Sequence, residues 1–200
     1  MIAAPWNVIL TLLFVVTAVI CFAGLADRSR RGRRDAGLTD SDLIDITHGI
    51  MSVAMIVMTW WTVWDAVTWA QVAIFAILAL ALVPSLRGAR GAQAVDLVGH
   101  IVLDAAMIWM LAAMPLLMAG MDMSEDAGGA HAGHHGGGGV AIESTPVWVD
   151  VVNAVFIALC VAATVWWVWR SFRSSHHRIH SLCHILMAAG MGWMLILMNG

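Results

Sequence analysis

The chain has 200 residues, of which 61% are hydrophobic and 12% are charged, with a formal net charge of −3 at pH 7 and a mean hydropathy of +0.85. A soluble domain of this length needs a far more polar surface, so the composition excludes the soluble class and indicates an all-α integral membrane protein. The three cysteines are far apart in the sequence and form no Cys-x-x-Cys motif, so neither a disulfide framework nor a zinc module is indicated.

Six apolar runs follow one another along the chain, at residues 5–26, 43–64, 69–86, 95–119, 146–170 and 179–198. Each is near the roughly 20 residues that a helix needs to cross a bilayer core. The segment Thr39–Asp42 offers N-cap residues for the second run, and we expect a short turn at 64–69. We therefore predict that residues 1–200 form one membrane domain with six transmembrane helices.

The basic residues are all arginines, and they fall in or beside the connections after the first, third and fifth runs. By the positive-inside rule these connections are cytoplasmic and both termini are extracytoplasmic. The predicted location is the bacterial cytoplasmic (inner) membrane, with the lipid bilayer as a partner. A protein partner or a homo-oligomer stays open, and we expect no nucleic-acid partner.

A repeated pattern marks the second, fourth and sixth runs, where a His is followed by Met at plus 7 and plus 10 and, in two of the three copies each, at plus 3 and plus 14. These offsets fall on one face of an α-helix. Because the pattern occurs on every second run, we predict three helical hairpins in a pseudo-threefold bundle, with the patterned faces toward a common axis. We call these faces the Met stripes, and they comprise His48, Met51, Met55 and Met58; His100, Met107, Met110 and Met114; and His184, Met187, Met191 and Met194.

The stripes combine imidazole and thioether groups, which together suit Cu(I) better than zinc, magnesium or calcium. Thioethers also give weak, exchangeable sites of the kind that a conduction path needs. Asp104 follows His100 by one turn on the same face, so we expect it to accept a hydrogen bond from the imidazole or to carry a proton. The sequence thus predicts metal ligands along three membrane helices.

The connection at 120–145 is rich in Gly, His and Met, and we expect it to be a flexible extracytoplasmic loop. Short His-rich tracts are typical of metal binding. The candidate ligands in this loop are Met121, Met123, His131, His134 and His135. Its place after the fourth run predicts that it captures metal beside the outer end of a Met stripe.

The leading hypothesis is an integral membrane protein that transports, senses or stores Cu(I). One alternative is a haem-binding redox subunit with two membrane His as axial ligands. Another is a structural or assembly subunit of a membrane complex, in which the Met stripes only fill the core. The sequence contains no nucleophile–base pair, phosphate loop or nucleotide fingerprint, so an enzyme is not expected.

Two segments, Asp45–Trp60 and His184–Asn199, resemble an actinobacterial membrane family that is described as a domain of unknown function. The resemblance covers almost the whole chain. It implies several membrane spans, His–Met helices, a His- and Met-rich outer loop and a bacterial inner-membrane location. It implies no activity, so the functional hypothesis depends on the residues themselves.

Overall fold

A computed structural model describes residues 5–30, 39–61, 65–125, 146–173 and 178–198. These residues form six helices and no strand. All six helices are long and apolar enough to cross a membrane, which confirms the predicted all-α membrane class. The helices are α1 (Trp6–Arg30), α2 (Asp40–Trp60), α3 (Asp65–Leu86), α4 (Ala92–Glu125), α5 (Val147–Arg173) and α6 (Arg178–Met198).

The helix boundaries agree with local sequence signals in some places and correct our expectations in others. The predicted N-cap of α2 is confirmed, because Thr39 and Asp42 form a capping box in which each side chain accepts a hydrogen bond from the other's backbone N–H. The predicted turn at 64–69 is wrong, since α3 already begins at Asp65. Residues 65–83 contain neither Gly nor Pro, so nothing in this stretch interrupts the helix before Pro84. The helix α4 continues to Glu125 and so includes the first residues of the expected loop.

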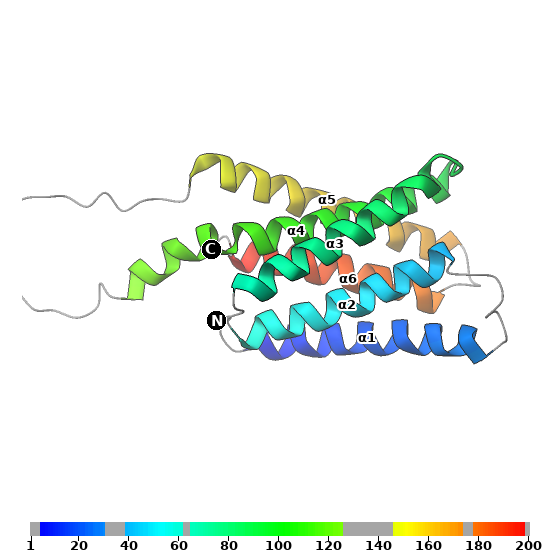
Figure 1. Cartoon of the computed structure of the whole chain (residues 1–200), viewed down its shortest axis with the longest axis horizontal. Helices are drawn as coiled ribbons and strands as arrows, with labels where there is room; N and C mark the ends of the chain where they lie inside the picture. The colour runs from blue at the N-terminus through cyan, green and yellow to red at the C-terminus, as the bar shows by residue number, and fades with distance from the viewer. Residues whose placement is uncertain (1–4, 31–38, 62–64, 126–145, 174–177, 199–200) are drawn as a thin grey trace, which may run out of the picture.

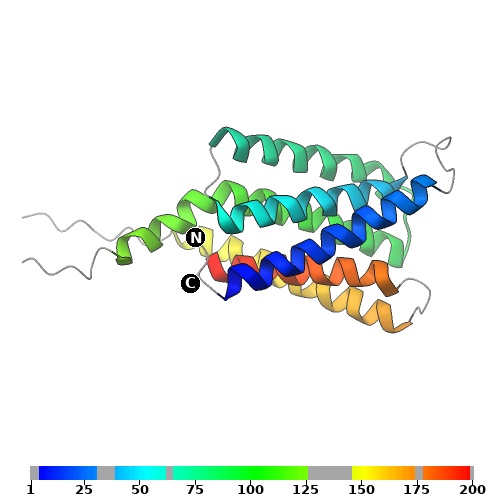
Figure 2. The ribbon, with the colours of Figure 1, turned by 90° about the horizontal axis from the view of Figure 1, so that it is seen from below.

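Each odd-numbered helix packs most extensively against the even-numbered helix that follows it, which gives the three hairpins α1–α2, α3–α4 and α5–α6. Smaller contacts of α2 with α3, α4 with α5 and α1 with α6 join the hairpins into a closed ring. Figures 1 and 2 show the six helices running side by side along the long axis of the molecule. The hairpin arrangement predicted from the alternating stripes is confirmed.

The three striped helices occupy the centre of the bundle. In the most apolar window of each span, 56%, 50% and 56% of the residues of α2, α4 and α6 are buried, against 22%, 11% and 22% for α1, α3 and α5. In Figure 2, α3 and α5 lie at opposite edges of the bundle and α1 lies toward the viewer. The outer helices therefore present their apolar surfaces to lipid, while the Met stripes face inward.

Glycines on the central helices admit aromatic rings from the outer helices. A Cβ on Gly49 would lie 2.9 Å from the ring of Phe22, and a Cβ on Gly99 would lie 2.9 Å from the ring of Trp167. Small residues allow this close approach of membrane helices. The two glycines are sequence neighbours of His48 and His100, so close packing between the outer and central helices lies beside two of the candidate ligands.

The two ends of the bundle differ in charge. The start of α1 and the end of α6 lie together at one end, which we call the termini end (Figure 1). The helices α1, α3 and α5 end at the opposite end, which we call the Arg end because described arginines such as Arg30, Arg87 and Arg170 lie there. All three striped helices begin at the Arg end, so their histidines lie at similar depth.

Candidate metal centre

Three histidines from the three central helices meet inside the bundle near the Arg end. The ring centroid of His48 lies 5.0 Å from those of both His100 and His184, and the latter two centroids are 4.6 Å apart. One candidate ligand nitrogen of each ring lies within 4.8 Å of the others. The side chains are only 1%, 4% and 8% exposed, respectively. We call His48, His100 and His184 the tri-His cluster.

Trp167 of α5 covers one side of the tri-His cluster. Its ring stacks on His100 at a centroid distance of 5.1 Å and an interplanar angle of 28°, and it lies 5.3 Å from the ring of His184. The ring fits there because Gly99 has no side chain. Since Trp167 is almost fully buried, it limits the rotation of both imidazoles and excludes lipid from the cluster.

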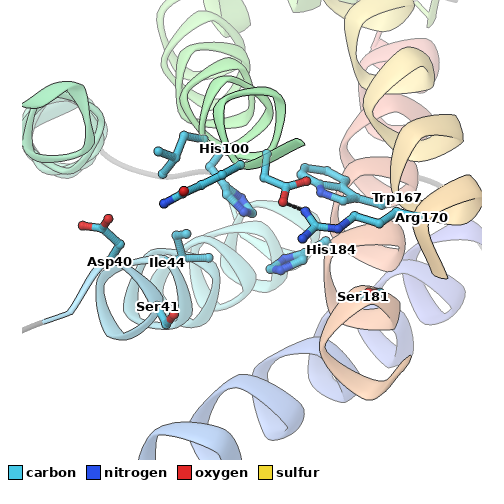
Figure 3. A pocket seen from close by; sticks show the side chains of 11 residues that line it. Asp40, Ser41, Ile44, His100, Trp167, Arg170, Ser181 and His184 are labelled. Atoms are coloured by element: carbon cyan, nitrogen blue, oxygen red, sulfur yellow. Dashed lines mark ion pairs between the residues drawn. The ribbon is translucent and has the colours of Figure 1, made fainter. Parts of the chain in front are cut away.

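A cavity of about 240 Å³ leads from the Arg end to the tri-His cluster. Figure 3 shows the rings of His100 and His184 at this cavity, with Asp40, Ser41 and Ile44 of α2 on another wall. We call this cavity the vestibule. Its lining brings together the N-terminal parts of α2, α4 and α6 and the C-terminal part of α5, so it gives the buried histidines a route to one side of the membrane.

The mouth of the vestibule carries fixed charges. Asp96 forms an ion pair with Arg170 and accepts a hydrogen bond of 2.9 Å from the indole N–H of Trp166. Asp40 accepts a hydrogen bond of 2.8 Å from the hydroxyl of Ser85. The charged groups in the lining of the vestibule are thus two carboxylates, Asp40 and Asp96, and one guanidinium, Arg170.

The predicted stripe methionines face the bundle interior. Their side chains are buried, with Met114 only partly so, and all belong to the same apolar core. The hydroxyl of Ser52 donates to the carbonyl oxygen of His48 at 2.7 Å and lies 3.8 Å from the sulfur of Met187. The stripes of α2 and α6 therefore face each other directly beyond the tri-His cluster.

Asp104 does not make the hydrogen bond to His100 that we expected. Its side chain is 0% exposed, and neither carboxylate oxygen has a hydrogen-bond partner among the described residues. The physical reason is the direction of the side chain, since the imidazole of His100 lies against the rings of His48 and His184 instead. A buried carboxyl in a membrane span is costly.

The loop candidates are not part of the described site. His131, His134 and His135 lie outside the described residues, and Met121 and Met123 belong to the extended end of α4 without a described side chain. Capture of metal by this segment stays a prediction.

Sequence reasoning missed two cysteines beside the cluster. The Sγ atoms of Cys21 and Cys183 lie 2.7 Å apart, although the residues are 162 positions apart in the sequence. A local signal existed only for Cys183, which directly precedes His184. Cys21 belongs to an outer helix without a stripe, so its place beside the cluster depends on the packing of α1.

Three converging imidazoles are a sufficient donor set for a transition-metal ion. Three protein ligands with imidazole nitrogens about 2.0–2.1 Å from the metal are typical of zinc, and imidazole also suits copper, iron and nickel. The nitrogen separations in the tri-His cluster require only small ring rotations to reach such distances. Trp167 covers one side of the cluster, and the vestibule on another side measures about 240 Å³, which admits a small ion.

This fold and site define a class, a multi-pass membrane protein of three helical hairpins with a buried His cluster on its central axis. The chain belongs to a family described as a domain of unknown function (DUF5134), whose model matches residues 42–198. The match includes all three members of the tri-His cluster and Cys183, but not α1. No curated protein and no solved structure matches the chain.

Proposed function

We propose that this protein binds Cu(I) at the tri-His cluster and passes it along the Met stripes, across a bacterial cytoplasmic membrane. The observation that carries the proposal is the convergence of three imidazoles at the start of three buried rows of thioethers. One Met in a membrane core is ordinary packing. Three inward-facing rows in register with three clustered histidines form a continuous set of soft ligands.

The ligand types favour Cu(I) over other ions. Hard cations such as Mg²⁺ and Ca²⁺ prefer oxygen ligands, whereas thioethers select Cu(I). Zinc accepts imidazole, but its protein sites are built from Cys, His, Asp and Glu rather than from Met. A zinc site would therefore account for the tri-His cluster and leave the Met stripes as packing, while Cu(I) accounts for both.

The proposed path along the Met stripes crosses about half of a hydrocarbon core that is roughly 30 Å thick. The ion enters through the vestibule or leaves by it, because this cavity connects the tri-His cluster to the Arg end. From His184 to Met194 the helix rises about 15 Å at 1.5 Å per residue. By the positive-inside rule the Arg end is cytoplasmic, and the termini end with the His-rich segment 126–145 is extracytoplasmic.

A Cu(I) titration of detergent-purified protein against a competing Cu(I) chelator, without oxygen, tests the proposal. Loss of a ligand-orienting partner alone costs about 10- to 100-fold in metal affinity. The ligand variants His100→Gln and His184→Gln should therefore weaken Cu(I) binding at the tri-His cluster by at least about 100-fold, whereas a Cu(I) site elsewhere in the chain would keep its affinity. Thr59→Val is the matched control, because Thr59 is also buried on a central helix but lies three turns beyond His48. If the His variants bind the same number of Cu(I) ions as the wild type, with the same affinities, the assignment is refuted.

A further inference from the structure

A pair of thiols lies next to the tri-His cluster. Cys21 of α1 and Cys183 of α6 are both buried, and their Sγ atoms are 2.7 Å apart. The Cys183 Sγ also lies 3.9 Å from the carbonyl oxygen of Thr17. Both cysteines are free thiols in the structure. We call Cys21 and Cys183 the thiol pair.

His48 connects the thiol pair to the tri-His cluster. One ligand atom each from Cys21, His48 and Cys183 lies within 4.8 Å of the others, as is also true of the three histidines. The contact of Phe22 with Gly49 brings α1 and α2 close together at this depth. His48 thus belongs to two adjoining ligand groups, and its two ring nitrogens allow it to serve both.

We infer that Cys21, Cys183 and His48 form a second Cu(I) site, which adjoins the tri-His site through the shared imidazole of His48. This inference rests on the proposed function and extends it from one bound ion to two. Thiolate is the softest ligand that a protein offers and selects Cu(I) strongly. Two sulfurs and one nitrogen supply a three-coordinate site without any residue from the Met stripes.

Metal entry requires two local changes. At a metal–sulfur distance of about 2.3 Å, two sulfur ligands stand roughly 4 Å apart, so the thiols must separate by about 1 Å through rotation of their side chains. Each thiol also loses its proton when its sulfur binds the ion. When both sites are filled, the shared His48 ring binds through both nitrogens and also loses its N–H proton. Three protons then leave, and two thiolates and one imidazolate form, while copper stays in the Cu(I) state and no electron is transferred.

The charge of the thiolates links the two sites. Two thiolates in a membrane interior carry two negative charges, and uncompensated buried charge is costly. One Cu(I) ion at the thiol pair leaves one net negative charge, which attracts a second Cu(I) ion to the adjoining tri-His cluster. The two ions should therefore bind with positive cooperativity, and removing the thiol pair should also weaken Cu(I) binding at the tri-His cluster by several fold.

The test is an anaerobic Cu(I) titration of the reduced, full-length protein in detergent. Its two readouts are the number of ions bound per chain and the thiolate-to-copper charge-transfer absorption in the near ultraviolet. Wild-type protein should bind two ions at these sites and show the absorption. The double variant Cys21→Ser/Cys183→Ser should bind one ion and lose the absorption. The double variant His100→Gln/His184→Gln should bind one ion and keep it. Cys160→Ser, which replaces the third buried cysteine, should match the wild type.

The outcomes separate this inference from the proposed function. A wild type that binds one ion without charge-transfer absorption, and that is unaffected by loss of the thiol pair, would overturn the second site and leave the tri-His site standing. No Cu(I) in any variant would overturn both. Alkylation of the unfolded protein should label three thiols per chain, and a persistent count of one would show a Cys21–Cys183 disulfide instead of a metal site.

Discussion

Replacing Gly99 with Ala tests the packing that holds the tri-His cluster in place. The new Cβ would lie 2.9 Å from Cζ2 and 3.2 Å from Cη2 of Trp167. Ordinary contact begins near 3.4 Å, so the indole must move by about 0.5 Å. Trp167 is only 2% exposed and cannot swing into lipid. It must press on His100, whose ring it already stacks against.

Two opposing effects set the size of the change. Overpacking of a well-packed core costs about 1–3 kcal/mol, whereas Ala in place of Gly within a helix gains about 1 kcal/mol. The net loss is about 1 kcal/mol, which lowers the melting temperature by roughly 2–4 °C for a chain of this length. Thermal unfolding of the detergent-purified protein measures it. Gly88→Ala is the control, because no atom lies within 4 Å of a Cβ at that position.

A double-mutant comparison makes the test specific to Trp167. In a Trp167→Phe background the smaller ring leaves room for the Cβ, so Gly99→Ala should there be neutral or stabilising by about 1 kcal/mol. The expected coupling between the two positions is about 1–3 kcal/mol. If Gly99→Ala stabilises the protein equally in both backgrounds, Trp167 does not lie against Gly99 and the described enclosure of the tri-His cluster is wrong.

Three further predictions address the ligands and the buried carboxyl. Met51→Leu conserves side-chain volume and should change stability by less than about 1.5 kcal/mol. In the chelator titration it should weaken Cu(I) binding several fold and leave Zn²⁺ binding unchanged. Equal loss of affinity for both ions would contradict a thioether role. Lowering the pH from 8 to 5 should progressively release Cu(I), since only neutral imidazole and ionised thiol bind metal. A Cu(I) affinity that is constant over this range would exclude the described ligands. Asp104→Asn should raise the melting temperature, because the native carboxyl is buried without a hydrogen-bond partner among the described residues; a lower melting temperature would show that the carboxyl is stabilised in the folded protein.

Much of the architecture follows from sequence periodicity. Hydropathy locates the six spans, and the recurrence of His with Met at helical offsets identifies which three helices are central. Burial of Met51, Met107 and Met187 confirms the inward orientation of the stripes. These features are predictable because each depends on residues within one helix, where the helical repeat alone determines which side chains share a face.

The surroundings of the cluster could not be predicted in the same way, because they depend on contacts between helices. The thiol pair joins residues from the first and last helices, and no local pattern relates Cys21 to Cys183. Trp167 enters the core because Gly99 leaves room for its ring, and no local pattern relates these two residues. The expected Asp104–His100 hydrogen bond failed for a related reason, since sharing a helical face does not determine which way two side chains turn.

The most direct test of the central claim is the position of copper in crystals of the Cu(I)-loaded protein, located from anomalous scattering at the copper absorption edge. We predict an anomalous peak within bonding distance of the imidazole nitrogens of His48, His100 and His184, which disappears in His100→Gln. Copper bound only at other positions, or no ordered copper at all, would contradict the assignment of the tri-His cluster as a metal centre and would leave the Met stripes as apolar packing.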